Sequence, residues 1–262
     1  MSPSDTLSRI LDTTRAALRE SPPDEGLLHT RVQAQNPPVD TLAALGGAGL
    51  SIIAEIKRRS PSEGDLRGGL NPVDIATGYA EAGAAAISVL TEPAYFGGSL
   101  EDLSSVSNAV SIPCLRKDFI VDPIQVLEAR ASGASLVLLI VAALEDGPLR
   151  DLRESIETLG MEALVEAHTA DEVRRAVDAG SRIIGVNNRD LSTFNIDLGV
   201  AETLRPLIPT GVVTVAESGI YTEDDLGRMV RAGYDACLIG SSLMRSTDPT
   251  QTLRDLLASA NP

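Results

Sequence analysis

The sequence contains very few lysine, histidine, cysteine and aromatic residues. Its 262 residues include no Trp, two Cys and two His, and only 3% of them are aromatic. His29 and His168 are far apart in the chain, and Cys114 and Cys237 fall in separate apolar runs, so no metal-ligand spacing occurs. The pattern predicts that no metal is bound. It also predicts two buried free thiols in a reducing compartment, which we take to be the cytoplasm.

Long apolar runs and excess positive charge are also missing. No run of about 18 apolar residues is present that could span a membrane, and the N-terminus looks like an amphipathic helix rather than a signal peptide. The 37 acidic residues outnumber the 22 basic ones, for a formal net charge of −15, which argues against nucleic acid as a partner. A phosphate ligand would need a local cluster of donors, because the overall field repels anions.

Lysine is the scarcer of the two strong cations. Lys57 and Lys117 are the only lysines among the 22 Lys and Arg residues. Arg keeps its proton near neutral pH, whereas a partly buried Lys can give it up. Both lysines are therefore candidates for proton donors. Lys57 follows Glu55 by two residues in an apolar run, so both side chains share one face of a strand. A salt bridge at a strand end on the protein surface is the alternative for this pair.

Short apolar runs alternate with amphipathic stretches from residue 49 to the end of the chain. Predicted strands occupy 51–57, 85–91, 112–117, 135–141, 162–167, 182–187, 211–217 and 235–240. Predicted helices lie near 73–82, 99–109, 123–132, 147–159, 170–179, 198–207, 223–232 and 249–259. Eight such units predict an α/β fold, a (βα)8 TIM barrel. An open doubly wound sheet is the alternative, but its Gly-rich dinucleotide loop is missing.

No linker or change of composition divides residues 49–262, which we interpret as one catalytic (βα)8 domain. Residues 1–48 form a predicted N-terminal helical extension packed on the barrel. Its Leu-rich face requires burial, and one possible position is across the barrel mouth.

Polar residues at the carboxyl ends of barrel strands are the candidates for chemistry. The set comprises Glu55, Lys57, Lys117, Glu166, Asn187, Arg189, Glu217 and Ser218. Several acids and bases in one apolar pocket have perturbed pKa values and suit general acid–base catalysis.

Small residues and two aromatic residues complete the candidate site. Gly219, Gly240 and Ser241 follow the last two strands and offer backbone N–H groups to a phosphate, although ordinary turns use the same residues. Phe96 and Phe119 fall in loops after strands, where they form a slot for a flat ring or simply pack the loops.

Eight segments, in order from about residue 50 to 245, together resemble indole-3-glycerol-phosphate synthase of tryptophan biosynthesis. They are AEIKRRSPS, LTEPAYFGGSLEDL, LRKDFIVDP, LLIVAAL, ALVEAHT, IGVNNRDL, VAESGI and LIGSSLM. The resemblance implies a barrel with an N-terminal extension over its active-site end. It also implies a lyase that uses no cofactor and closes the pyrrole ring of 1-(2-carboxyphenylamino)-1-deoxyribulose 5-phosphate, with loss of carbon dioxide and water.

The resemblance also implies a role for each candidate. Lys117 would be the general acid of ring closure, Glu166 would assist proton transfer, and Glu55 with Lys57 would serve dehydration. Asn187, Glu217 and Ser218 would contact the substrate hydroxyls. The anthranilate carboxylate would meet Ser60 and Arg189, and its ring would lie among Phe96, Phe119, Pro61 and Leu138. The phosphate would bind at Gly219, Gly240 and Ser241.

Two other functions fit a barrel of this kind. One is a phosphoribosyl isomerase with the same phosphate site, which Lys117 and Glu166 argue against. The other is an inactive barrel that assembles with other tryptophan-pathway enzymes, which the intact charged pocket argues against. Expected partners are a small phosphorylated substrate, no nucleic acid and no membrane, with the chain either monomeric or bound to other enzymes of the pathway.

Overall fold

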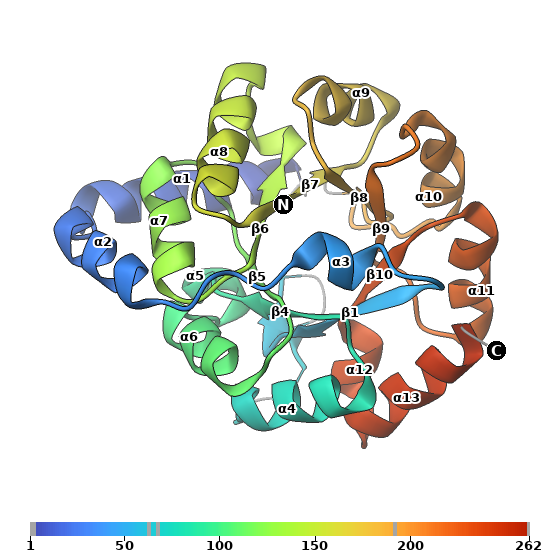
Figure 1. The fold of residues 1–262 in the computed structure, drawn as a ribbon. Helices are drawn as coiled ribbons and strands as arrows, with labels where there is room; N and C mark the ends of the chain where they lie inside the picture. The colour runs from blue at the N-terminus through green and yellow to red at the C-terminus, as the bar shows by residue number, and fades with distance from the viewer. Residues whose placement is uncertain (1–3, 62–63, 67–68, 191–192, 261–262) are drawn as a thin grey trace.

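The chain folds around a closed barrel of parallel strands, as Figure 1 shows. The structure is a computed structural model, and it describes residues 4–61, 64–66, 69–190 and 193–260. The barrel strands close in the order β1-β10-β9-β8-β7-β6-β5-β4. They are β1 (Ser51–Ile56), β4 (Ala86–Leu90), β5 (Cys114–Lys117), β6 (Leu136–Ile140), β7 (Glu162–Ala167), β8 (Ile183–Asn187), β9 (Val213–Glu217) and β10 (Ala236–Ile239). The predicted fold class is confirmed.

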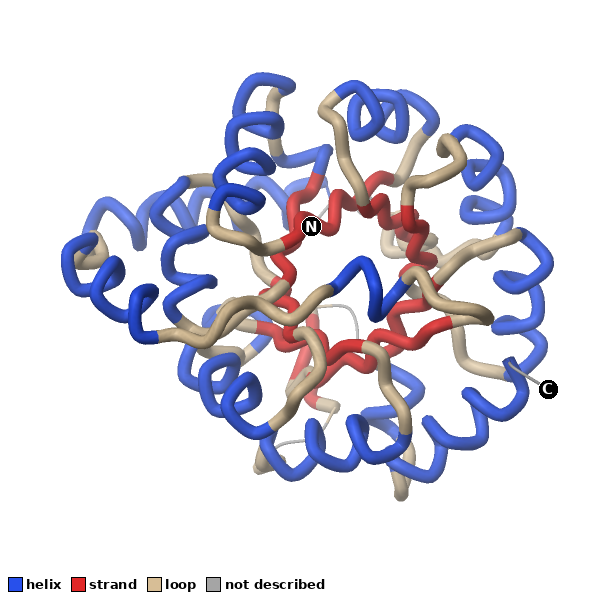
Figure 2. Tube along the Cα trace, viewed as in Figure 1, coloured by secondary structure: helices blue, strands red, loops and turns tan. Residues whose placement is uncertain are grey.

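Helices surround the strands as an outer ring, which Figure 2 shows in blue around the red strands. The ring contains α4 (Pro72–Ala82), α6 (Leu100–Ala109), α7 (Pro123–Ala131), α8 (Asp146–Thr158), α9 (Ala170–Asp178), α10 (Gly199–Leu204), α11 (Glu223–Ala232) and α13 (Pro249–Ala260). Shorter elements lie in the connections: the β2 (Arg59–Ser60) and β3 (Gly64–Asp65) hairpin, α5 (Pro93–Phe96), η1 (Val141–Ala143), η2 (Arg205–Leu207) and α12 (Ser241–Arg245).

Three helices precede the barrel: α1 (Ser4–Glu20), α2 (Glu25–Ala34) and α3 (Thr41–Leu45). In Figures 1 and 2 α3 crosses the barrel opening at the amino ends of the strands. Leu45 is fully buried there and packs in the barrel interior with Ile53. Helix α2 packs on α7, and Ile10 of α1 lines the cavity at the opposite end. The division into an extension and one catalytic domain stays a prediction.

The two-residue period of each strand separates two hydrophobic clusters. Ile52, Ala54 and Ile56 of β1 face outward and pack against the helices, whereas Ile53 faces inward. The inner cluster contains Leu45, Ile53, Ala86, Leu115, Leu136, Leu138, Ile140, Leu164, Ile183, Val215, Ala236 and Leu238. The barrel is therefore a packed core rather than a pore, and the described inward side chains that carry charge gather above these layers, at its carboxyl end.

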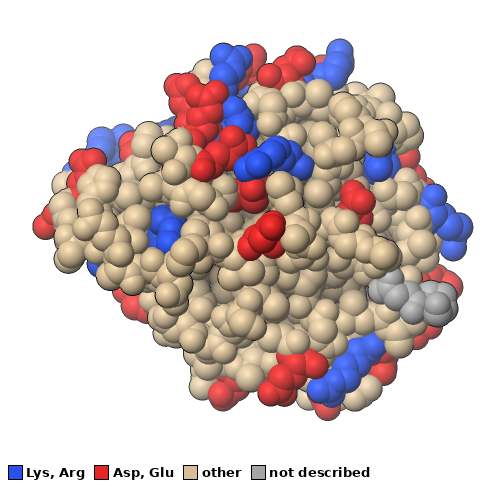
Figure 3. Space-filling view, in the orientation of Figure 1, with Lys and Arg blue, Asp and Glu red and all other residues tan. Residues whose placement is uncertain are grey.

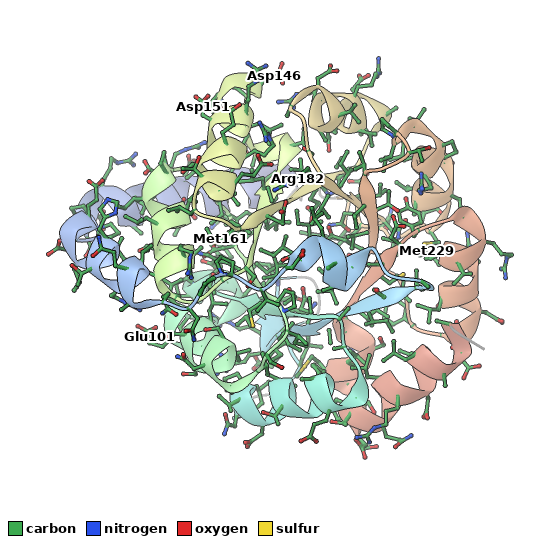
Figure 4. All side chains as sticks on the ribbon, in the orientation of Figure 1. Glu101, Asp146, Asp151, Met161, Arg182 and Met229 are labelled. Atoms are coloured by element: carbon green, nitrogen blue, oxygen red, sulfur yellow. The ribbon has the colours of Figure 1, made fainter. Side chains whose placement is uncertain are left out.

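Side chains on the outer ring follow the same division. In Figure 4 Met229 on α11 lies between its helix and the strands, and it is fully buried. Asp146 and Asp151 on α8 extend to solvent. Figure 3 views the amino-terminal end of the barrel, where acidic and basic side chains are interspersed around a largely uncharged centre.

Several local predictions are also confirmed. Gly83, Gly133, Gly180 and Gly233 follow helices with φ between 79° and 101°, the left-handed conformation that glycine adopts without steric cost. Both cysteines are buried and free. The predicted helix at 198–207 differs in detail, because Pro206 has no N–H and the chain tightens from α10 into the 3-10 turn η2.

Candidate active site

One cavity lies at the carboxyl ends of the strands, and every candidate residue of the sequence lines it. The set is Glu55, Lys57, Ser60, Pro61, Phe96, Lys117, Phe119, Leu138, Glu166, Asn187, Arg189, Glu217, Ser218, Gly219, Gly240 and Ser241. The strands bring these residues together for a simple reason. Residues 55, 117, 166, 187 and 217 share the inward phase of their strands and form the last inward positions, above the hydrophobic layers.

Lys117 lies among three carboxylates. Its Nζ is 3.5 Å from Oε2 of Glu217 and 3.7 Å from Oε2 of Glu166. The Lys117 side chain is 15% exposed, and those of Glu166 and Glu217 are 3% and 1% exposed. Burial opposes the charged ammonium, but its interactions with Glu217, Glu166 and Glu55 outweigh burial and raise the pKa of Lys117. Lys117 is therefore held in its protonated, proton-donating form.

The two carboxyl groups beside Lys117 differ in protonation. Burial raises the pKa of Glu217 well above its ordinary value, and the neighbouring charge of Glu166 raises it further. Burial also disfavours ionised Glu166, but Lys117 and His168 outweigh this effect and lower the pKa of Glu166. Of these two groups, Glu217 therefore keeps a proton more readily, and Glu166 is the one that ionises first.

A second ion pair forms the opposite wall of the cavity. Nζ of Lys57 lies 3.0 Å from Oε1 of Glu55, and it donates a hydrogen bond to Oγ of Ser241 at 3.3 Å. Burial disfavours ionised Glu55, yet Lys57 and Lys117 lower its pKa. Ser241 is the first residue of α12, so the contact joins the end of β1 to the segment after β10. The Glu55–Lys57 pair is buried, which excludes the alternative of a solvent-exposed salt bridge.

The end of β9 carries backbone strain. Ser218 has φ of 65°, a left-handed conformation that costs a non-glycine residue about 1–3 kcal/mol. Asn188 holds this conformation, since its Nδ2 donates to the carbonyl oxygens of Glu217 and Ser218, each at 3.1 Å. Its Oδ1 accepts from the backbone N–H of Ala201 at 3.0 Å. Sequence reasoning missed this function of Asn188, because nothing in the sequence shows that it faces β9.

Aromatic and aliphatic side chains line the outer part of the cavity. The rings of Phe96 and Phe119 lie 6.1 Å apart between centroids and are tilted by 39°. Phe194 also lines the cavity, so all three Phe residues of the chain meet there. Leu7 and Ile10 of α1 complete this side. Phe194, Leu7 and Ile10 were missed as site residues. For Leu7 and Ile10 the available signal was the Leu-rich face of the first helix.

His168 is a further residue that the sequence prediction missed. Its Nε2 lies 3.4 Å from Oε1 of Glu166, and its Nδ1 lies 3.1 Å from Oε2 of Glu172. The signal was present as a Glu-x-His sequence, Glu166 to His168, across the end of β7. In the part of the chain that the structure describes, no group of three or more His, Cys, Asp or Glu residues is arranged to hold a metal ion.

A closed parallel barrel with buried acids and bases at the carboxyl ends of its strands defines a (βα)8-barrel enzyme that works by acid–base chemistry. The family model "Indole-3-glycerol phosphate synthase" matches residues 7–256. An indole-3-glycerol phosphate synthase of Parafrankia sp. (strain EAN1pec) is 50% identical over 96% of this chain and 94% of its own length. One of Streptomyces coelicolor is 49% identical over 96% and 94%.

The chain belongs to the indole-3-glycerol phosphate synthase family. It is a carboxy-lyase of tryptophan biosynthesis that forms indole-3-glycerol phosphate by ring closure, decarboxylation and dehydration of a small phosphorylated substrate. A thiamine phosphate pyrophosphorylase from Pyrococcus furiosus has the same fold, with a TM-score of 0.61, 16% identity and coverage of 80% of this chain and 95% of that one. Among the described residues, no helix has the length and apolar character needed to cross a membrane.

Proposed function

We propose that Lys117 is the general acid that starts the reaction of 1-(2-carboxyphenylamino)-1-deoxyribulose 5-phosphate. The observation that carries this assignment is the position of Nζ between Glu166 and Glu217, at 3.7 and 3.5 Å. An ammonium held protonated inside the barrel donates its proton to the substrate carbonyl oxygen while the aromatic carbon bonds to the carbonyl carbon. Carbon dioxide then leaves, and its electron pair restores the aromatic ring.

Glu166 is the group that assists proton transfer at Lys117. Its carboxylate is ionised, buried and within ion-pair distance of Nζ, so it favours the ammonium before donation and accepts or returns a proton afterwards. Protonated Glu217 has a hydrogen to donate and lies next to the same ammonium. We assign it, with Asn187 and Ser218, to the hydroxyl groups of the substrate.

Glu55 and Lys57 serve the dehydration. Nζ of Lys57 protonates the leaving hydroxyl, and the carboxylate of Glu55, 3.0 Å away, takes the proton that the ring carbon loses. The pair lies on β1, away from the Lys117 cluster on β5, β7 and β9. Ring closure and dehydration are thus assigned to two acids on different walls of one cavity.

Binding of the two ends of the substrate falls to the remaining residues. The phosphate is assigned to Gly219, Gly240 and Ser241, where Ser241 contacts Lys57 and backbone N–H groups are available. The anthranilate ring is assigned to the slot of Phe96, Phe119, Pro61 and Leu138, with Ser60 and Arg189 at its carboxylate. A small phosphorylated substrate and two buried free thiols support a cytoplasmic location, with the chain monomeric or associated with other enzymes of the pathway.

Two product assays distinguish the two acids. Labelled carbon dioxide reports ring closure and decarboxylation, and indole fluorescence reports dehydration. Lys117→Ala and Lys117→Arg release no carbon dioxide, because Arg keeps the charge but does not give up its proton. Lys57→Met releases carbon dioxide with little indole. Exposed Arg174 provides a control, and Arg174→Met keeps both signals. Full activity of Lys117→Ala would show that Lys117 is not the general acid. Equal losses of carbon dioxide and indole in Lys57→Met would show that ring closure and dehydration do not use separate acids.

A further inference from the structure

The reaction consumes one proton in each turnover. The substrate enters as an ionised carboxylate, because carboxylic acids have pKa values near 4. Ring closure takes a proton onto the carbonyl oxygen, and carbon dioxide leaves without one. Dehydration takes a proton onto the leaving hydroxyl and returns one from the ring carbon, so these two cancel. If Lys117 makes the first donation, as proposed above, it must be protonated again from another source before the next turnover.

Bulk water has little access to Lys117 and Glu166. Their side chains are 15% and 3% exposed, and both line the cavity, so a substrate bound there would cover them further. The next titratable group outward from Glu166 is His168, directly beyond the end of β7. Its side chain is 10% exposed, and that of Glu172 beyond it is 18% exposed. These residues form a line of proton-binding groups from Lys117 toward the outside of the barrel.

The geometry of Glu172 decides which ring nitrogen of His168 titrates. Oε2 of Glu172 accepts a hydrogen bond from the backbone N–H of His168 at 2.7 Å, which fixes the carboxylate beside the ring. The same oxygen lies 3.1 Å from Nδ1. An ionised carboxylate only accepts hydrogen bonds, so Nδ1 carries a hydrogen and Nε2 is the nitrogen that gains and loses a proton.

Nε2 lies near Glu166. It is buried, it makes no hydrogen bond to any described residue, and Oε1 of Glu166 lies 3.4 Å away. The charged groups that act on the ring are Glu166 on β7, Glu172 on α9 and Lys117 on β5. Burial disfavours the imidazolium, but the hydrogen bond to Glu172 and attraction by both carboxylates outweigh burial and Lys117, so the pKa of His168 is raised. The surroundings of His168 therefore favour its imidazolium form.

We propose that His168 is a positioning residue that also stores the proton with which Lys117 is recharged. Nε2 of the imidazolium gives its proton to Oε1 of Glu166, and Glu166 passes it to the neutral amine of Lys117. His168 is left neutral, with its remaining hydrogen on Nδ1 held by Glu172. After the product leaves, Nε2 regains a proton through Glu166, which lines the cavity. One proton enters and one is consumed, so the cycle balances without any other reactant.

A proton stored on His168 predicts a difference in rate between the first turnover and those that follow. The first turnover uses the proton already on Lys117 and does not need His168. In His168→Gln, which keeps polar atoms but does not titrate, the single-turnover rate with enzyme in excess stays within about threefold of wild type. The multiple-turnover rate falls about 100-fold or more, because a positioned proton-transfer group typically contributes on the order of 100- to 10,000-fold. Added imidazole restores that rate in proportion to its protonated fraction.

The other histidine of the chain provides a matched control. His29 on α2 is 59% exposed beside Glu25, and His29→Gln leaves both rates unchanged. Glu172→Gln keeps its shape but no longer supports the imidazolium, so in this variant the multiple-turnover rate declines at lower pH than in wild type. Equal losses of the single-turnover and multiple-turnover rates in His168→Gln would show that His168 only supports the structure of the site. Unchanged rates, or no response to imidazole, would overturn the store while leaving Lys117 as the acid, which the Lys117 variants test separately.

Discussion

The carboxylate of Glu217 occupies the space that a side chain on Gly185 would fill. A Cβ built on Gly185 would lie 2.2 Å from Oε1 of Glu217 and 3.2 Å from Cδ1 of Leu164. Gly185 is the middle residue of β8, paired with Glu166 on one side and Val215 on the other. The backbone of Gly185 does not require glycine, since its φ lies outside the left-handed range. Glycine is required because the Glu217 side chain leaves no room for a Cβ. It makes room for protonated Glu217 beside Lys117.

Gly185→Ala therefore displaces Glu217 and disturbs the cluster around Lys117. A shift of about 1 Å in a catalytic group costs on the order of 100-fold in rate, so kcat falls by about that factor. The free energy of unfolding falls by about 1–3 kcal/mol from overpacking. Gly147→Ala is the control, because a Cβ there meets nothing within 4 Å. Steady-state kinetics and urea unfolding of both variants measure the effects. Wild-type kcat in folded Gly185→Ala would contradict the displacement of Glu217.

Glu217 and Glu166 have pKa shifts of opposite direction, so their Gln variants change stability in opposite directions. The raised pKa of Glu217 means that the folded protein keeps a proton which the unfolded chain releases above pH of about 4.3. Its contribution to stability is present below that pH and is lost as the pH rises. Glu217→Gln keeps the neutral form at every pH, so it is more stable than wild type at pH 8, and the difference shrinks toward pH 5.

Glu166→Gln gives the reverse result. The pKa of Glu166 is lowered by Lys117 and His168, so its ionised form stabilises the fold above the unfolded value and loses that contribution as the pH falls. The Gln variant is less stable than wild type at pH 8. Urea unfolding of both variants at pH 5, 6.5 and 8 checks the two signs. The same sign for both variants at pH 8 would contradict the assignment of one proton to Glu217.

The sequence was sufficient for the barrel and for the polar residues at the carboxyl ends of its strands. Strand periodicity places Glu55, Lys117 and Glu217 on inward faces, and strand order places them at one end. These are local patterns, and every strand repeats them. The glycines after helices are equally local, because a left-handed turn depends on only a few residues.

Contacts between distant segments could not be predicted in the same way. Asn188 donates a hydrogen bond to the backbone of β9, and Gly185 leaves room for the Glu217 side chain. Both relationships depend on the register of β8 against β9. The position of Ile10 depends on how α1 crosses the mouth. His168 was overlooked because a single histidine after a strand is uninformative until Glu172, one helical turn later, is seen to hold its ring.

We expect neither thiol to react in the folded protein. Cys114 is 2% exposed and Cys237 is fully buried. Burial raises the pKa of Cys114 to about 12 and also raises that of Cys237, so almost no thiolate is present near pH 8. The test is a disulfide reagent that releases a coloured thiolate when it reacts with a thiol. In the native protein at pH 8 we expect no colour over an hour. In 6 M guanidinium we expect two reactive thiols per chain. Reaction of either thiol at native pH faster than global unfolding would show that its site opens locally.

Arg116 stabilises the loop that carries Phe119, and this function follows from the alternation of β5. Lys117 faces the cavity, so Arg116 faces the outer helices, where its Nη2 lies 3.0 Å from Oδ2 of Asp118 and its Nη1 lies 3.2 Å from Oε2 of Glu128. Asp118 also accepts from Thr91 Oγ1 at 2.6 Å and from the Phe119 N–H at 2.8 Å. The network thus fixes the backbone on both sides of Lys117.

Arg116→Met leaves the buried carboxylate of Asp118 and the partly buried carboxylate of Glu128 without their cation, so the free energy of unfolding falls by about 3–5 kcal/mol. In the fraction that remains folded, the loop loosens and KM rises, because Phe119 no longer lies firmly against Phe96. Arg116→Lys recovers only part of the loss, since one ammonium does not reproduce the guanidinium contacts with Asp118, Glu128 and the Gln125 carbonyl. Exposed Arg174→Met is the control and changes stability by less than about 0.5 kcal/mol. Urea unfolding with KM measurements tests both effects, and a wild-type KM in folded Arg116→Met would confine the network to stability alone.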